Sequence, residues 1–179
     1  MAILPIRQLG DPVLRELARP VERFDDALAK LADDMLETMY DAPGVGLAAP
    51  QIGVSLRLIV FDDGDGQGGR VLVNPQVENL MGEQILDEGC LSVRGPYAET
   101  ARAVHLHVRG FSLAGEPVGF PAEGLLARIM QHEADHLDGT LFVDRISVEA
   151  RREVMRQLRE QEIRGGPPGP GRARSDRPG

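Results

Sequence analysis

The stretch Gln131–His136 constrains this chain more than any other, because it sets His132 and His136 four residues apart with Glu133 beside the first. On a helix, residues four apart lie on one face, one above the other. Two imidazoles held in this way can bind one metal ion, and the glutamate can reach a water on that ion. The pattern predicts a metal-binding helix; two core histidines satisfied by hydrogen bonds are the alternative.

The residues around this stretch favour a helix. Residues 124–130 contain no proline and mostly strong helix formers. At roughly 100° per residue, Leu125 and Ile129 fall on the same stripe as the two histidines. Gly139 marks the expected end of the helix. We therefore expect the histidines to continue the buried stripe of an amphipathic helix, where a metal site is partly shielded from water.

Length and composition indicate one soluble catalytic or binding domain. A chain of 179 residues can bury a full core, and no apolar run approaches the roughly 20 residues that span a membrane. The N-terminus has neither a secretory signal nor a transit peptide, and the single Cys90 fits a reducing compartment. We therefore expect a cytoplasmic protein that has no membrane partner. The net charge of −8 argues against a general nucleic-acid binder, so we expect no DNA partner.

The C-terminal residues differ in composition from the rest. Nine of the sixteen residues 164–179 are Gly or Pro, and none is a large apolar residue. This composition predicts a disordered tail after a domain of residues 1–163. The tail carries a charge of +3 beside a body of −11. It could help the protein reach the RNA-rich ribosome, or it could be a solvated end without a partner.

Three helices are expected outside the metal-binding stretch. Asp11-Pro12 can start a short one, and Asp25 or Asp26 can cap a longer one that ends before Pro43. Ser147 can cap a last helix over Val148–Ile163. The apolar side of that last helix is predicted from Val148, Met155 and Leu158.

Between Leu56 and Val118 the chain is predicted to form strands. The acidic, glycine-rich residues 62–69 lack the complete calcium-loop pattern and are expected to connect a hairpin. His105 and His107 share one face of a strand, where they are expected to face solvent rather than bind metal. The expected strands are Leu56–Phe61, Val71–Asn74, a hairpin of Val77–Leu80 with Gln84–Asp87, and Ala103–Val108.

The segment Gly44–Gln51 has a different character. It is too rich in glycine for a regular strand and too apolar for a solvent loop, so a tight turn or a close backbone approach is expected. It is not a phosphate-binding loop, because no Lys-Ser or Lys-Thr pair follows its glycines.

A metal site on the helix needs a third protein ligand. Cys90, within Glu88–Ser92, is one candidate, and a thiolate with two imidazoles suits zinc or ferrous iron. A thiolate also makes the metal a weaker Lewis acid, so that a base such as Glu133 matters more. In a zinc metalloprotease the third ligand would come from downstream, where the candidates are Glu149, Glu153 and Glu160.

Taken together, three stretches resemble the signature motifs of the peptide deformylase family, in the family's order. They are Gly44–Gln51, Glu88–Ser92 and Gln131–His136. The opening Ile3–Ile6 with Gly10–Pro12 is also similar to the start of that family. The resemblance covers roughly residues 2–160.

The resemblance implies an α+β fold in which antiparallel β-sheets wrap around a central metal-binding helix, with N-terminal and C-terminal helices. It implies removal of the formyl group from the N-terminal formyl-methionine of new polypeptides. It also implies one divalent metal ion, Fe²⁺ in many members, with Zn²⁺ or Ni²⁺ able to substitute.

By motif position, the resemblance assigns roles to residues of this chain. Cys90, His132 and His136 would hold the metal, and Glu133 would act as general base and then as acid. The Gln51 side chain and the Leu91 backbone N–H would stabilise the oxyanion.

Substrate contacts can be added from the residue types. Gly44 and Gly46 would let a peptide backbone lie alongside the loop, as in strand addition. Val45, Leu125 and Ile129 are candidates for the apolar pocket of the methionine side chain. Where many relatives have proline after the second motif, this chain has Arg94, with Tyr97 nearby, which leaves the peptide preference beyond methionine open. A non-enzymatic ribosome-associated module remains a further alternative.

Overall fold

The computed structural model describes residues 2–165. Its first helices begin where the sequence predicts. The 3-10 helix η1 spans Pro12–Arg15, and the Asp11 side chain accepts a hydrogen bond from the Val13 N–H. Helix α1 spans Asp26–Asp41 and is capped by Asp25. Both predictions are confirmed.

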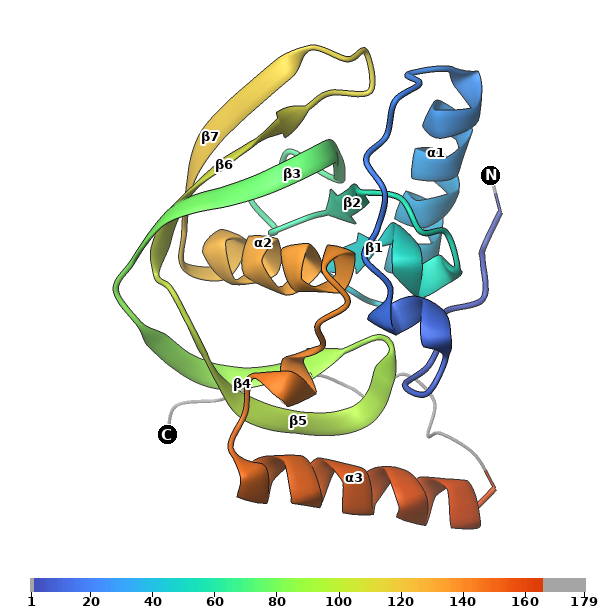
Figure 1. Ribbon diagram of the computed structural model, residues 1–179, viewed down its shortest axis with the longest axis vertical. Coiled ribbons are helices and arrows are strands. Elements are labelled where there is room, and N and C mark those ends of the chain that lie inside the picture. Colours follow the sequence, from blue (N-terminus) through green and yellow to red (C-terminus); the bar gives the residue numbers. More distant parts are fainter. Residues whose placement is uncertain (1, 166–179) are drawn as a thin grey trace.

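The strands form two antiparallel sheets, as Figure 1 shows. The larger sheet has five strands in the order β1-β2-β3-β6-β7, and the smaller one is the hairpin β4-β5. Helix α2, Gly124–Leu137, lies against the larger sheet and also contacts β5. The strands are β1 Gly46–Ala48, β2 Leu58–Phe61, β3 Arg70–Met81, β4 Gln84–Cys90, β5 Val93–Arg102, β6 His105–Phe111 and β7 Pro117–Glu123.

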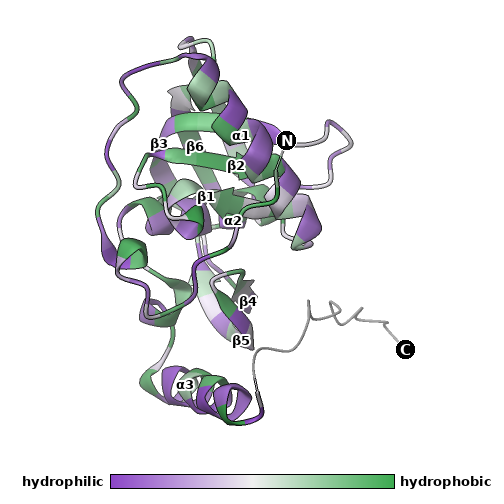
Figure 2. Cartoon of the chain, turned by 90° about the vertical axis from the view of Figure 1, so that its right-hand side faces the viewer, coloured by the Kyte–Doolittle hydropathy of each residue, from purple (hydrophilic) through white to green (hydrophobic). Residues whose placement is uncertain are grey.

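Strand β2 explains why helices cover both faces of the larger sheet. All its residues are buried, and alternate side chains of a strand point to opposite faces. Ile59 and Phe61 pack in the cluster that holds Met130 and Leu137 of α2. Leu58 and Val60 pack in the cluster that holds Met35 and Met39 of α1. The continuous apolar run of β2 therefore has a hydrophobic partner on each side, and α2 is fixed against the sheet (Figure 2).

Strand β3 carries the chain out of the larger sheet. Its pairing with β6 shifts register between Val73 and Gln76, where Pro75 has no N–H to donate, and again between Glu78 and Met81. Bulges bend a strand and increase its twist, and β3 is strongly curved in Figure 1. The chain therefore leaves the sheet at Met81 and enters β4.

This path corrects the predicted hairpin of Val77–Leu80 with Gln84–Asp87. The two segments do not pair, since β3 pairs with β6 and β4 pairs with β5. Local sequence favours the nearer partner, whereas the bulges in β3 turn the chain into a second sheet. The prediction of no regular strand near Gly46 was also wrong, because Gly46–Ala48 is strand β1.

The last helix, α3, begins at Val148 and ends at Ile163, with Ser147 as its cap, as predicted. Its buried side chain is Val154, and the predicted Leu158 is partly buried against the same cluster. Val148 is 62% exposed, so the predicted apolar side is only partly correct. Val154 packs with Val93 and Ala98 of β5. The 3-10 helix η3, Phe142–Asp144, links α2 to α3, and η2, Ala49–Ile52, follows β1.

The architecture confirms the α+β fold of antiparallel sheets around a central helix. Within residues 2–165 there is no helix long and apolar enough to cross a membrane. The predicted tail lies outside the described residues from position 166 onwards.

Candidate metal centre

Helix α2 brings two imidazoles together. The Nε2 atoms of His132 and His136 lie 3.2 Å apart, with the rings stacked edge to face one turn from each other. His136 is 1% exposed. The predicted buried stripe is only partly correct: Ile129 is buried, as expected, but Leu125, at the start of the stripe, is 51% exposed. The first turn of α2 therefore borders a pocket rather than the core.

Cys90 reaches the same point from the end of β4. Its Sγ lies 3.3 Å from His136 Nε2, and the ligand atoms of Cys90, His132 and His136 all lie within 4.8 Å of one another. Leu91 and Ser92 form the turn into β5, and the Ser92 N–H points at Sγ at 3.4 Å.

The donor set fits a metal ion. Ligand atoms around a tetrahedral zinc at 2.0–2.3 Å lie about 3.3–3.6 Å apart. The two shorter separations here, 3.2 Å and 3.3 Å, are close to that spacing. A soft thiolate with two imidazoles is typical of zinc or ferrous iron, and three protein ligands leave a position open.

Glu133 stands beside these ligands without a polar partner. Its Oε2 is buried and makes no hydrogen bond to any residue of the described chain. Burial raises the pKa of Glu133 to about 7, and the charge of His132 opposes part of that rise. A buried carboxyl with a pKa near neutrality suits a group that takes up and releases a proton.

Gly46 of β1 lies against Glu133. A Cβ on Gly46 would stand 2.4 Å from Glu133 Oε1 and 2.9 Å from Cδ. Glycine at position 46 therefore allows the backbone to approach the Glu133 side chain closely, as expected from the sequence. On the same loop, a Cβ on Gly44 would meet Leu91 Cδ1 at 2.7 Å.

Hydrogen bonds fix the Gln51 amide. Its Oε1 accepts a hydrogen bond from the Ala48 N–H at 2.9 Å, and its Nε2 donates to Ser92 Oγ at 3.1 Å. The same Nε2 lies 3.7 Å from Cys90 Sγ. The amide therefore presents its NH₂ group to the candidate metal centre.

A buried ionic network behind His132 was not predicted. His132 Nδ1 lies 2.6 Å from Glu88 Oε1, which fixes the ring so that Nε2 faces the ligand cluster. Arg102 donates from Nε and Nη2 to Glu88 at 3.1 Å and 2.5 Å, and from Nη1 to Asp135 at 2.7 Å. Arg145 also donates to Asp135. Glu88 and Asp135 stand inside the recognised motifs, but nothing in the sequence pairs them with Arg102.

These contacts set the charges of the metal-free cluster. Burial raises the pKa of Glu88, but hydrogen bonds from His132 and Arg102 outweigh it and lower that pKa to about 2. Burial also opposes protonation of His132, yet Cys90 and Glu88 raise its pKa well above the ordinary value. Burial, and then the charge of His132, lower the pKa of His136.

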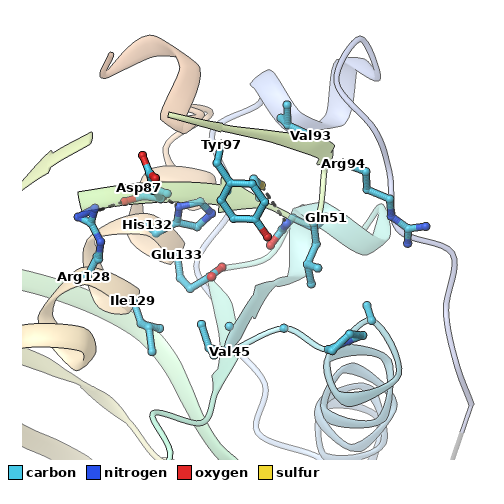
Figure 3. Close-up of a pocket in the computed structure, with 18 of the residues that line it drawn as sticks. Val45, Gln51, Asp87, Val93, Arg94, Tyr97, Arg128, Ile129, His132 and Glu133 are labelled. Carbon is cyan, nitrogen blue, oxygen red and sulfur yellow. Dashed lines mark hydrogen bonds and ion pairs between the residues drawn. The ribbon is translucent and has the colours of Figure 1, made fainter. Parts of the chain in front are cut away.

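The cluster opens into a cavity of about 650 Å³. Figure 3 shows the Glu133 carboxylate directed into it, with Val45 and Ile129 on one side and Tyr97 on the other. The five residues predicted to bind substrate all line this cavity: Gly44, Val45, Gly46, Leu125 and Ile129. Gln51, Leu91 and Cys90 line it too.

The other metal-ligand candidates lie elsewhere. Among residues 2–165, only Cys90, His132 and His136 form a group that could hold a metal. His105 is exposed, and His107 lies 3.5 Å from Glu78. Glu153 and Glu160 pair with Arg156 on the outside of α3.

Known proteins resemble this chain over most of its length. The family model of polypeptide deformylase matches residues 3–152. A peptide deformylase of Acidothermus cellulolyticus is 53% identical over 92% of this chain and 91% of its own length. One from Halothermothrix orenii is 51% identical over 82% of this chain and 95% of its own length.

Solved structures agree with the sequence comparison. The crystal structure of a peptide deformylase from Legionella pneumophila has a TM-score of 0.87 and 47% identity, covering 93% of this chain and 100% of that one. A peptide deformylase from Synechococcus elongatus, solved in complex with actinonin, has a TM-score of 0.82 and 42% identity, covering 86% and 85%. With the ligand cluster and the three motifs in place, these matches establish that the chain belongs to the polypeptide deformylase family.

Proposed function

We propose that the chain removes the formyl group from the N-terminal formyl-methionine of new polypeptides, with Cys90, His132 and His136 holding one divalent metal. One observation carries the proposal. The three ligand atoms converge within 4.8 Å beside a buried carboxylate whose Oε2 has no hydrogen-bond partner among residues 2–165, at the wall of a cavity large enough for a peptide end.

Glu133 is proposed to move the proton. A divalent metal, when bound, supplies a Lewis acid and lowers the pKa of water. Glu133 accepts a proton from the attacking water and then gives it to the leaving amine. Its pKa of about 7 allows both steps near neutral pH, because neither protonation state is strongly favoured there.

Gln51 and Leu91 are proposed to stabilise the oxyanion of the tetrahedral intermediate. The Gln51 NH₂ group is already oriented by its bond to Ser92 and by the Ala48 N–H on its oxygen. Leu91 follows Cys90 directly, so its N–H lies near the cluster by connectivity. Donors fixed before the reaction need little reorganisation when charge develops.

The substrate is proposed to lie as an extended strand along β1. This strand is at the end of the larger sheet, paired with β2. Gly44 and Gly46 line the cavity and let a backbone approach. The methionine side chain then enters between Val45, Leu125 and Ile129, which are apolar and line the same cavity.

We propose Fe²⁺ as the natural metal, with Zn²⁺ or Ni²⁺ able to substitute. A thiolate and a ferrous ion in an open site are both oxidisable. Iron-loaded protein should therefore lose activity in air and keep it under nitrogen, while nickel- or zinc-loaded protein should be durable in both. Metal analysis of anaerobically purified protein identifies the ion. Equal durability of the iron form in air and nitrogen would contradict this assignment.

Cys90→Ala tests the ligand set. We expect the variant to lose its metal and its release of formate from a formyl-Met-Ala-Ser peptide. A metalloprotease that used Glu149, Glu153 or Glu160 would keep its metal instead. A non-enzymatic module would release no formate even in its unmodified, metal-loaded form.

We further propose that residues 1–163 form the catalytic domain, that the protein acts in the bacterial cytoplasm, and that the basic tail 164–179 helps it find the ribosome. The support comes from composition: the tail carries a charge of +3, whereas the rest of the chain carries −11. Its positive charge would attract the phosphates of ribosomal RNA. Truncation after Ile163 should leave peptide activity unchanged and weaken ribosome binding at low salt. Equal ribosome binding by the full-length and the truncated protein would contradict this role of the tail.

A further inference from the structure

Tyr97 is a large aromatic side chain left at the mouth of the cavity. It lies on β5, where Pro96 and Ala98 on either side are buried, while Tyr97 itself is 60% exposed. It lines the cavity that holds the Glu133 carboxylate. Nothing in the proposed roles of the metal ligands, the oxyanion donors or the methionine pocket uses this ring.

The ring is held in place by the strands beneath it. A Cβ on Gly89 would lie 2.6 Å from Tyr97 Cε1 and 2.9 Å from Cδ1, so the ring rests against the Gly89 backbone. Gly89 is at the register shift between Glu88 and Cys90. Below the start of β5, the Gln161 side chain of α3 packs so closely on Gly95 that a Cβ there would stand 2.1 Å from its Nε2. Tyr97 therefore projects from a strand that packs against α3, and its ring rests on Gly89, the residue before Cys90.

An extended peptide presents successive side chains to opposite sides. If the first side chain enters between Val45 and Ile129, the second points away from them. Figure 3 shows Tyr97 on the opposite side of the Glu133 carboxylate from Val45 and Ile129. The second side chain of the peptide is thus directed to the wall that Tyr97 forms.

We propose that Tyr97 is a specificity-determining residue that makes the enzyme prefer an aromatic side chain at the second position of the peptide. The inference rests on the proposed function and its strand-addition pose. The proposal uses the ring, because the ring lines the cavity and can pair with a second aromatic side chain. One aromatic pair is expected to change kcat/KM by about 2- to 10-fold.

The test compares two peptides, formyl-Met-Phe-Ser and formyl-Met-Ala-Ser, by formate release. The unmodified, metal-loaded enzyme should favour the Phe peptide in kcat/KM by about 2- to 10-fold. Tyr97→Ala should bring the ratio close to one, and Tyr97→Phe should keep it. Tyr40→Ala is the matched control, because Tyr40 is the only other tyrosine and does not line the cavity, and it should keep the ratio.

Each result separates the inference from the proposed function. A ratio near one in the unmodified enzyme, or an unchanged ratio in Tyr97→Ala, overturns the role of Tyr97 while formate release still supports deformylation. Equal losses on both peptides with a lower melting temperature would make Tyr97 structural and also overturn the inference. No formate from either peptide with the unmodified enzyme would instead overturn the proposed function.

Discussion

Replacing Arg102 by methionine should destabilise the fold and loosen the metal centre together. The Arg102 side chain is 4% exposed and donates hydrogen bonds to two buried carboxylates, Glu88 and Asp135. Removing one partner of a buried ion pair costs about 3–5 kcal/mol, because the remaining charge is left buried. Glu88 keeps His132, and Asp135 keeps Arg145, so the lower end applies.

We therefore expect Arg102→Met to lower the free energy of unfolding by about 3 kcal/mol. For a chain of this size, that loss corresponds to about 6–12 °C in melting temperature. Arg102 holds Glu88, which in turn orients His132, so freeing Glu88 should lower metal affinity by about 10- to 100-fold. Urea unfolding of the metal-free protein measures the first effect, and chelator competition measures the second.

Two variants serve as controls. Arg145→Met removes the other partner of Asp135, but its side chain is 51% exposed, so about 1 kcal/mol or less is expected. Glu88→Gln, added to Arg102→Met, neutralises the carboxylate that has lost Arg102. The double variant should therefore lose less stability than the sum of the losses measured for the two single variants. A loss below about 1 kcal/mol for Arg102→Met would refute the charge argument. A stability loss with unchanged metal affinity would refute the orienting role of the network.

Three further outcomes are expected. Glu133→Gln should keep the metal and lower formate release by about 10²–10⁴-fold, since glutamine cannot accept the proton; near-normal turnover would refute the role of Glu133. Gly46→Ala should lower kcat by up to about 10²-fold with unchanged metal content, because its Cβ would displace the Glu133 carboxylate; a loss of metal instead would point to ligand disruption. Burial raises the pKa of Asp144, but Arg15, the Leu141 N–H and Arg151 outweigh it and lower that pKa. The ionised Asp144 carboxylate therefore stabilises the fold at pH above its unfolded pKa of about 3.9. This stabilisation is lost as pH falls through the lower pKa that Asp144 has in the folded protein. Asp144→Asn should be about 1 kcal/mol less stable than the unmodified chain at pH 7, and that difference should vanish in acid unfolding well below pH 4; a constant difference would refute the ionic contribution.

Local sequence patterns determined much of this protein. Caps are local hydrogen bonds, so Asp25 and Ser147 marked the starts of two helices. The spacing of His132 and His136 placed both imidazoles on one face of α2, because that depends only on helical geometry. The motif order then pointed to Cys90, which lies within ligand distance of His136.

Only the tertiary structure decided which distant segments meet. The pairing of β4 with β5 depends on the bulges of β3, which redirect the chain away from the nearest partner. Arg102 reaches Glu88 and Asp135 from another strand, and side chains so far apart in sequence leave no local pattern. Tyr97 stands at the cavity because α3 and Gly89 support β5 from two sides, so its position follows from packing rather than from its own residue type.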